Sequence, residues 1–363
     1  MKPTSWRFDL HLDASLLIAV TVTAMLGLVV LYSAGGQDTE LLFKQGVRIT
    51  LGFAVMFALA QISPRALLRL APVFYLVGLA LLVLVLFFGS GRGAQRWLDL
   101  GVIRFQPSEI MKLAVPLTLA GFLGEQVLPP SKRVLVIALI LVLLPATLIV
   151  KQPDLGTAIL VASSGVFVIY FAGISWRIMR NGLLLGLAAA PLAWYALHDY
   201  QRRRILTLLD PESDPLGAGY HTIQATIAVG SGGIHGKGWL NGTQSHLEFL
   251  PERSTDFIFA VYCEEFGLLG VGVLMLAYTM IILRSLQIAV EAQDMFGRLV
   301  AASLTSTFFI YLFVNMGMVT GQLPVVGVPL PLVSFGGTSL VTLMASFGIL
   351  MSVHTHRKFI SVN

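Results

Sequence analysis

The sequence predicts an all-α integral membrane protein: a bundle of about ten transmembrane helices with both termini cytoplasmic and one long ordered extracytoplasmic loop. Of its 363 residues, 56% are hydrophobic and only 12% are charged, and the mean hydropathy is +0.82. A soluble domain carries about 25% charged residues, so this chain is too apolar to cover a water-soluble surface. Disorder requires low hydrophobicity and high net charge, and the composition excludes it too. We therefore expect residues 1–363 to form a single polytopic membrane domain.

Ten apolar segments qualify as spans, because a bilayer core of about 30 Å requires about 20 residues of helix. The first segment is too long for the core of a cleavable signal peptide and lacks a clear small-residue cleavage site. Several others are short or interrupted by Pro or Gly, so their ends are approximate. In chain order the predicted spans are 14–34, 43–62, 71–89, 107–123, 133–150, 156–173, 180–198, 257–283, 299–320 and 337–353.

Lysine and arginine in the short connections predict the orientation, because cytoplasmic loops carry an excess of both. With the N-terminus inside, an even number of spans also places the C-terminus inside. Residues 199–256 then form the long outer loop, and their mixture of charge, glycine and apolar residues predicts that this loop folds against the bundle. A second outer segment, residues 321–336, is rich in Pro and Gly. Each inner segment carries one basic pair: Lys2 with Arg7, Arg65 with Arg69, Lys132 with Arg133, Arg177 with Arg180, Arg284 with Arg298, and Arg357 with Lys358.

The charge and cysteine content exclude several functions. The net charge of +5 and the pI of about 9.4 are typical of membrane proteins with basic inner loops. The longest basic run, Arg202 to Arg204, has no recognition module around it, so nucleic acid is not expected as a partner. The single cysteine, Cys263, excludes an intrachain disulfide and a cysteine-based metal site. The glycine-rich segment 230–238 has neither the P-loop spacing nor a preceding strand, which rules it out as a nucleotide site.

Four of the basic residues assigned to the outer side stand in or beside apolar segments, where a charge is energetically costly. Snorkelling of the charged group to the interface is one explanation for each of them. For the set as a whole, an anionic ligand on the outer side is the better explanation. The four residues are Lys44, Arg48, Lys112 and Lys151.

The strongest candidate for chemistry is PERSTDFIFAVYCEE, residues 251–265. Asp256 directly precedes an apolar helix, with Thr255 as a candidate cap, and a capping or dipole role is the simplest explanation for Asp256. Partial desolvation at this place would instead raise the pKa of its carboxyl toward the range of a general base. Glu264 and Glu265 lie deeper along the same helix. We expect them to face the bundle interior, where a glutamate can also be a structural hydrogen-bond partner.

The next motif is QPSEIMKLAVPL, residues 106–117, in which Glu109 and Lys112 are three apart and can pair on one helical face. A neutralised structural ion pair is one interpretation. In the other, both residues face a wet cavity, Lys112 lies beside a phosphate, and Glu109 orients Lys112 or binds a metal.

Two further motifs have both a structural and a functional explanation. In KQPDLGT, residues 151–157, Asp154 is expected to cap the following helix, while Lys151 and Gln152 can reach a polar ligand. The GGTS string at 336–339 can present backbone N–H groups to an anion at a helix start. Glycine for close helix packing explains that string equally well.

Together, these segments resemble the SEDS family (shape, elongation, division and sporulation), and its elongation members more than its division members. The resemblance covers nearly the whole chain in order, and its motifs are long and specific. One stretch, residues 246–249, is more acidic than the family pattern. The matching strings are QPSE at 106–109, KQPDLGTA at 151–158, RRRILTLLDPESDPLGAGYHTIQA at 202–225, GSGGIHGKGWLNGTQSHLEFLPERSTDFIFAVYCEEFG at 230–267 and TGQLPVVGVPLPLVSFGGTSL at 320–340.

This resemblance implies a peptidoglycan glycosyltransferase that polymerises lipid II, a disaccharide-pentapeptide on undecaprenyl diphosphate, at the outer face of the bacterial cytoplasmic membrane during cell elongation. The essential carboxylate of the family maps to Asp256, which would act as general base in a single inverting displacement. Arg48, Lys112 and Lys151 are then candidates to stabilise the diphosphate, and Glu109 to orient Lys112 or hold a metal. The expected partner is a class B penicillin-binding protein, a transpeptidase.

The predicted site therefore comprises Asp256 as the catalytic residue, with Glu109, Lys112, Arg48, Lys151 and Asp154 as substrate-binding residues. A divalent cation, Mg²⁺ or Mn²⁺, is expected at the diphosphate, and no organic cofactor is expected. The main alternative is a flippase or carrier for lipid II, which a bundle with internal charges also suits. A membrane scaffold without activity is a third reading. The outer placement of the charged residues, away from the midplane, favours the enzyme.

Overall fold

The computed structural model describes residues 10–90, 96–99, 104–197, 199–213, 218–243, 250 and 252–356. Within these ranges the regular structure is helical except for a short antiparallel hairpin, β1 (Leu98–Asp99) and β2 (Arg104–Phe105), in which Leu98 pairs with Phe105. The all-α class predicted from composition is therefore confirmed.

A helix occupies each of the ten segments predicted to cross the membrane, and seven of these helices are long and apolar enough to do so. The chain is thus a multi-pass membrane protein, while the full count of ten crossings stays a prediction. The seven are α1 (Ala14–Ala34), α2 (Thr39–Gln61), α3 (Pro64–Phe88), α5 (Lys132–Lys151), α11 (Ile258–Glu291), α12 (Met295–Val319) and α13 (Thr338–Thr355). The other three are α4 (Pro107–Gly124), the shorter apolar α6 (Leu155–Phe171) and α7 (Trp176–Ala196).

Several helices extend beyond the apolar windows, because capping residues and not hydrophobicity determine where they begin. Asp38 accepts hydrogen bonds from the backbone N–H groups of Glu40 and Leu41, so α2 begins four residues before its predicted span. Pro64 occupies the first turn of α3, where its missing N–H costs nothing. Helix α11 continues eight residues past its predicted end, through a stretch that mixes polar and apolar residues, as far as Glu291.

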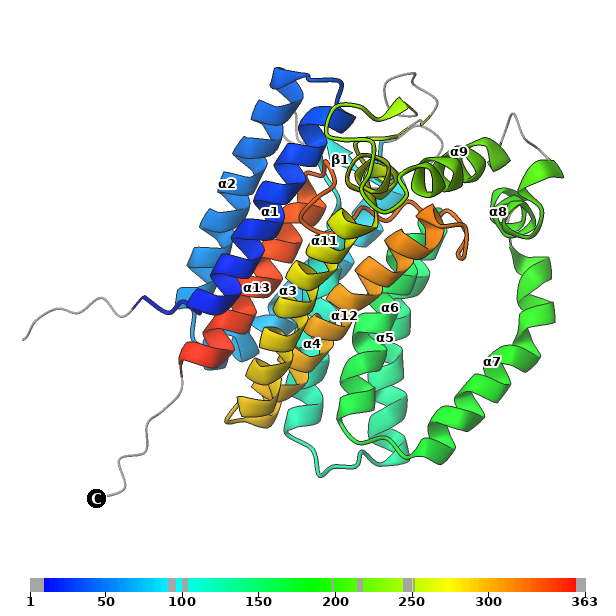
Figure 1. Cartoon of the computed structure of the whole chain (residues 1–363). Helices are drawn as coiled ribbons and strands as arrows, with labels where there is room; N and C mark the ends of the chain where they lie inside the picture. The colour runs from blue at the N-terminus through cyan, green and yellow to red at the C-terminus, as the bar shows by residue number, and fades with distance from the viewer. Residues whose placement is uncertain are drawn as a thin grey trace, which may run out of the picture.

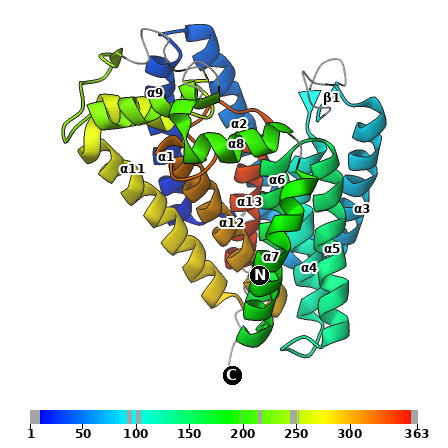
Figure 2. The same ribbon diagram turned by 90° about the vertical axis from the view of Figure 1, so that its right-hand side faces the viewer.

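The described residues form two large hydrophobic cores and one small one, and α12 contributes to all three. One large core joins α1, α2, α9, α11 and α13, and the other large core joins α3, α4, α5 and α6. Phe308 and Leu312 of α12 belong to the first core, whereas Leu299 and Val300 belong to the second. Helix α12 packs against α4, α6, α11 and α13, and it lies between α11 and α4 in Figure 2. Most residues of α4 and α12 are therefore buried against neighbouring helices.

Helix α7 stands apart from the other spans in Figure 1. Its large apolar side chains are exposed, for example Leu185 at 72% and Leu192 at 75%. In a membrane, lipid would contact such a surface, which agrees with the prediction that this segment is a span.

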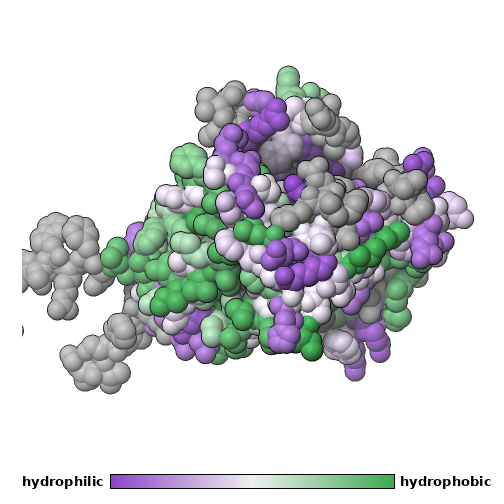
Figure 3. Space-filling view, turned by 45° about the horizontal axis from the view of Figure 1, so that its top comes forward, coloured by the Kyte–Doolittle hydropathy of each residue, from purple (hydrophilic) through white to green (hydrophobic). Residues whose placement is uncertain are grey.

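The segment predicted as a long loop, residues 199–256, contains α8 (Asp199–Leu209), the 3₁₀ turn η1 (Pro211–Ser213) and α9 (Ala218–Ser231). Helix α9 packs against α11 and α12. It shares one end of the bundle, here called the site end, with the β1–β2 hairpin (Figure 1). With this end turned toward the viewer, hydrophilic residues gather over it, and hydrophobic ones cover the flank at the left (Figure 3). Residues 246–249 lie outside the described residues.

The two described ends of the chain lie together at the opposite end of the bundle. The rings of His11 and His356 stack with centroids 3.8 Å apart. Nearby, Asp13 forms an ion pair of 2.6 Å with Arg284, which joins α1 to α11. An even number of crossings fits this arrangement. The terminal basic pairs, Lys2 with Arg7 and Arg357 with Lys358, lie outside the described residues, and the cytoplasmic placement of the termini stays a prediction.

Candidate functional site

Asp256 lies in a turn of residues 252–257 that leads into α11. The helix itself begins at Ile258, two residues later than Asp256, with Phe257 as the N-terminal flanking residue. The prediction that Thr255 caps this helix is wrong: its hydroxyl donates to the Glu252 carboxylate at 2.7 Å, so it stabilises the turn. Backbone hydrogen bonds from Thr255 and Phe257 to the Glu252 carbonyl close this turn.

The Asp256 carboxylate is largely removed from water. Its pKa is raised from 3.8 to about 6: burial is the largest cause, the negative charge of Glu252 adds to it, and the positive charge of Arg204 opposes both. Gly327 lies directly beside the carboxylate: a Cβ at this position would stand 3.4 Å from Oδ2, and its φ of +77° is one that glycine adopts easily. The segment 321–336 therefore passes beside Asp256.

Glu109 and Lys112 form a buried ion pair near the start of α4, with Nζ 2.6 Å from Oε1. Only 4% of Glu109 and 6% of Lys112 is exposed. The ammonium group also lies 5.1 Å from the centre of the Tyr311 ring, which favours a cation. The second carboxylate oxygen of Glu109 and the Ser108 hydroxyl have no hydrogen-bond partner in the described part of the chain. The pair predicted from the spacing is present, with one oxygen of Glu109 left available.

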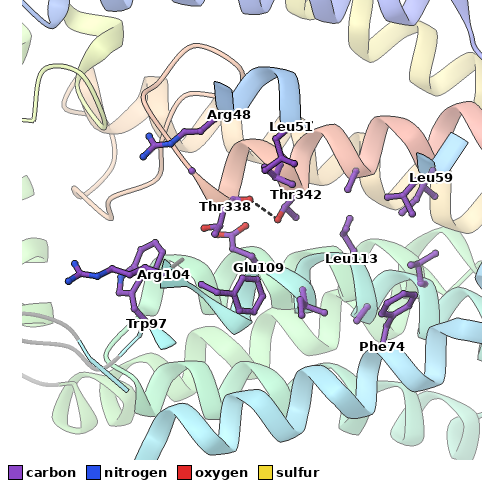
Figure 4. Close-up of a pocket in the computed structure, with 18 of the residues that line it drawn as sticks. Arg48, Leu51, Leu59, Phe74, Trp97, Arg104, Glu109, Leu113, Thr338 and Thr342 are labelled. Atoms are coloured by element: carbon purple, nitrogen blue, oxygen red, sulfur yellow. Dashed lines mark hydrogen bonds between the residues drawn. The ribbon is translucent and has the colours of Figure 1, made fainter. Parts of the chain in front are cut away.

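A cavity of about 1220 Å³ lies between α2, α3, α4 and α13. Most of its wall is apolar, including Leu59, Phe74 and Leu113. Figure 4 shows that these apolar residues lie toward one end and that the charged residues Arg48, Arg104 and Glu109 lie toward the other. The cavity is thus amphipathic along its length.

The charged end of the cavity is shaped by the start of α13. Gly337 and Thr338 line it, so the GGTS string does lie at a helix start beside the cavity. Arg48 stands with its guanidinium 4.1 Å from the centre of the Phe335 ring. Gln45 bridges the same segment by donating to the Ser334 carbonyl at 3.2 Å. Arg48 is therefore fixed beside the N-terminus of α13, where an anion is favoured.

Asp154 and Lys151 occupy different surroundings from the cavity residues. Asp154 caps α6 by accepting from the Thr157 N–H at 3.2 Å, as the sequence predicts, and it also accepts from the Gln106 amide at 2.9 Å. Lys151 is exposed and is not among the residues that line the cavity. Gln152 is buried and donates to the Leu82 carbonyl. Binding of a ligand by Asp154 and Lys151 stays a prediction.

Helix α11 is interrupted at Gly267, whose φ of 62° and ψ of −164° are not helical. A loop of residues 233–238 pairs with the backbone groups that the break leaves free, which fixes the short first part of α11 beyond the Asp256 turn. The hydrogen bonds run from Lys237 N to Glu264 O, Gly238 N to Glu265 O, Leu268 N to Gly233 O and Leu269 N to Ile234 O.

Glu264 and Glu265 face the interior, as predicted, and both accept structural hydrogen bonds. Glu264 is fully buried and receives Lys237 Nζ at 2.7 Å and the Thr243 N–H at 2.9 Å. Glu265 receives the Ser33 hydroxyl. The two glutamates therefore anchor residues 237–243 and α1 to α11.

The described residues contain no group of three or more His, Cys, Asp or Glu side chains that could hold a metal ion. Mg²⁺ is nevertheless often bound by one or two carboxylates together with substrate phosphates. The available oxygen of Glu109, at the charged end of the cavity, fits that mode.

Sequence reasoning missed Asn315, Tyr311 and Arg104 as parts of the site. The Asn315 side chain donates to the main-chain carbonyl of Asp256. Arg104 lies on β2 and lines the cavity. Polar residues inside apolar spans were a signal for Asn315 and Tyr311, but the sequence does not indicate which neighbours they meet.

A helical membrane bundle with an amphipathic cavity and a partly buried carboxylate at the same end defines a class: polytopic membrane proteins with an internal site that combines charged and apolar groups. A family model for the cell cycle proteins FtsW, RodA and SpoVE matches residues 13–359. The peptidoglycan glycosyltransferase MrdB of Escherichia coli K12 is 54% identical over 362 residues, 99% of this chain and 98% of MrdB. The MrdB of Helicobacter pylori is 36% identical, covering 98% and 93% of the two chains.

Solved structures of similar chains point to the same family. A chain from a peptidoglycan synthase complex that coordinates polymerization and crosslinking superposes with a TM-score of 0.82 at 36% identity, covering 94% of this chain and 97% of that one. The rod shape determining protein RodA of Thermus thermophilus gives 0.72 at 31% identity, covering 95% and 98%. The chain belongs to the FtsW/RodA/SpoVE family of cell cycle proteins, the SEDS family that its motifs resemble.

Proposed function

We propose that this peptidoglycan glycosyltransferase polymerises lipid II during cell elongation, at the outer face of the bacterial cytoplasmic membrane, with Asp256 as general base. The observation that carries the proposal is the Asp256 carboxylate itself. It is partly buried, its pKa is raised to about 6, and it lies beside the 321–336 segment that leads into the charged end of the cavity. A base with a pKa near 6 is ionised at neutral pH and still able to accept a proton.

The reaction is a single displacement with inversion. The hydroxyl oxygen of the acceptor sugar attacks the anomeric carbon of the donor, and the bond from that carbon to the diphosphate oxygen breaks. The diphosphate leaves with the electron pair, and the hydroxyl proton moves to Asp256. Because no covalent intermediate forms on the enzyme, one carboxylate is sufficient.

The cavity is proposed to hold the donor lipid. Its apolar wall suits the undecaprenyl chain, and its charged end, with Arg48, suits the diphosphate. A divalent cation, held by Glu109 together with the diphosphate, would neutralise the leaving group. Lys112 keeps Glu109 oriented through its 2.6 Å ion pair. In this scheme Lys151 and Asp154 lie away from the cavity and could act only on another part of the substrate.

A class B penicillin-binding protein is the proposed partner. It would supply the transpeptidase that crosslinks the new strands, since nothing in the proposed chemistry of this chain forms a peptide bond. The similarity to a chain from a synthase complex that combines polymerization with crosslinking supports this assignment.

The test is glycan synthesis by the purified protein with its transpeptidase partner, lipid II and Mg²⁺ or Mn²⁺. Polymer is expected from the wild type and none from Asp256→Asn, which keeps the size of the side chain. A penicillin should leave polymerisation intact. Movement of lipid II across liposomes without any polymer from the wild type would favour the carrier and refute the proposal.

A further inference from the structure

Asn315 is a fully buried residue on α12 whose side-chain amide is hydrogen-bonded to the backbone of the Asp256 turn. Its Nδ2 donates to the main-chain carbonyl of Asp256 at 3.0 Å and to the carbonyl of Val328 at 2.7 Å. Its Oδ1 has no hydrogen-bond partner among the residues that the structure describes. The flipped amide would place Oδ1 against two carbonyl oxygens, so the orientation is determined by its neighbours.

Ser334 makes a second connection between the same two segments. Its hydroxyl donates to the Thr255 carbonyl at 2.6 Å and accepts from the Leu330 N–H at 2.8 Å. The backbone of Phe335 adds a hydrogen bond to the Ser254 carbonyl at 2.8 Å. Three consecutive carbonyls of the turn, from residues 254 to 256, are therefore held by groups outside the turn.

These contacts matter because Asp256 lies on a turn and not within a helix. The turn follows the long outer segment, and hydration favours a carboxylate that has moved out toward water. Asn315 belongs to α12, which packs in both large hydrophobic cores. An amide in such a core is costly unless it is hydrogen-bonded, and here its bonds go to Asp256 and to the segment that carries Gly327.

We propose that Asn315 is a positioning residue for the general base: it joins the Asp256 turn to the 328–335 segment and to α12, and Ser334 reinforces the same connection. The inference rests on the proposed role of Asp256. Asn315 does not touch the reacting atoms. It fixes the distance between the carboxylate and the charged end of the cavity, because residues 336–338 continue directly from the braced segment into the cavity wall.

The test compares Asn315→Ala and Ser334→Ala with a matched control, Ser303→Ala. Ser303 is also fully buried on α12, and its hydroxyl donates to the Ser164 carbonyl at 2.7 Å, away from the Asp256 turn. Polymerisation kinetics on lipid II give kcat and KM for each variant in complex with the transpeptidase. Hydrogen–deuterium exchange of residues 252–257 reports the turn without any added label.

For Asn315→Ala we expect kcat to fall about 10- to 100-fold, since a displacement of about 1 Å at a catalytic group has that effect. KM should stay within about threefold of the wild-type value, because substrate binding is not the step affected. Hydrogen–deuterium exchange in residues 252–257 should become faster, because the turn has lost a hydrogen bond that holds it. Ser334→Ala should show a smaller fall in kcat and a smaller rise in exchange, again with little change in KM. If Asn315→Ala does not fold, Ser334→Ala is the variant that tests the proposal. Ser303→Ala should resemble the wild type.

Each other outcome overturns the proposal. A loss of kcat without faster exchange would mean that Asn315 acts on the substrate directly. Faster exchange with normal kcat would mean that the turn needs no brace, and equal loss in Ser303→Ala would mean general destabilisation. Asp256→Asn is measured in parallel: if it retains activity, the proposed function fails, while the exchange data still test whether Asn315 holds the turn.

Discussion

The pH dependence of polymerisation is the sharpest consequence of the Asp256 environment. If the proposed base has a pKa of about 6, it becomes protonated below pH 6. A plot of log(kcat/KM) against pH should then fall with a slope of one on the acidic side. About a tenth of the carboxylate remains ionised at pH 5, whereas a carboxyl with the ordinary pKa would remain about nine-tenths ionised there. A roughly tenfold loss of rate at pH 5 therefore distinguishes a carboxyl with a pKa of about 6 from one with the ordinary pKa.

The substitution Glu252→Gln gives this profile a specific perturbation. The negative charge of Glu252 raises the pKa of Asp256, so its removal should move the acidic midpoint to lower pH. Titration of lipid II itself would not respond to this change. Glu40→Gln is the control, because Glu40 is exposed and paired with Lys44. An acidic midpoint near 4 in the wild type, or the same midpoint in Glu252→Gln, would refute the reasoning.

The same pKa difference has a cost in stability. The folded pKa lies above the unfolded value of 3.8, so the folded protein binds more protons between pH 3.8 and about 6. Stability therefore falls as the pH rises through this window, by about 3 kcal/mol for a difference of about two pKa units. Asp256→Asn should abolish polymerisation at pH 7.5 and raise the thermal midpoint, and this gain should disappear near pH 4.

Three further predictions concern the surroundings of the base. Glu109→Gln leaves Lys112 as a buried uncompensated charge and should cost about 3–5 kcal/mol in thermal unfolding, most of which Lys112→Met in the same chain should restore. Lys237→Met removes the cation from buried Glu264 and should cost about 1.5–3 kcal/mol, with faster exchange at the Gly267 break; unchanged exchange would contradict this. Ala345→Trp fills the apolar part of the cavity and should raise KM for lipid II, whereas an unchanged KM would place the lipid elsewhere.

The sequence predicts the fold well, because the bilayer leaves few alternatives for an apolar chain. All ten predicted segments are helical, and the main errors concern ends: α2 begins at Thr39 and α11 continues to Glu291. Hydrophobicity marks the part of a helix inside the membrane, whereas capping residues such as Asp38 determine where the helix begins. The break at Gly267 also escapes such an analysis, because a loop far away in the sequence is what satisfies it.

The candidate site is only partly predictable, for a related reason. Glu109 and Lys112 are found because their interaction is local, three residues apart on one helix. The contact of Asn315 with Asp256 spans 59 residues, and that of Ser334 with Thr255 spans 79. Nothing in the local pattern of either segment indicates those pairs.

The structure also explains how a carboxylate with a raised pKa can persist at the end of an apolar helix. A carboxylate that is costly to bury tends to move toward water, and a turn of six residues offers little resistance to that movement. Here the backbone of the turn, and not the carboxylate, receives the hydrogen bonds from Asn315, Ser334 and Phe335. Hydrogen bonds to the charged oxygens would have lowered the pKa of Asp256 and weakened it as a base. Holding the main chain fixes the position of the proposed base while its basicity is preserved.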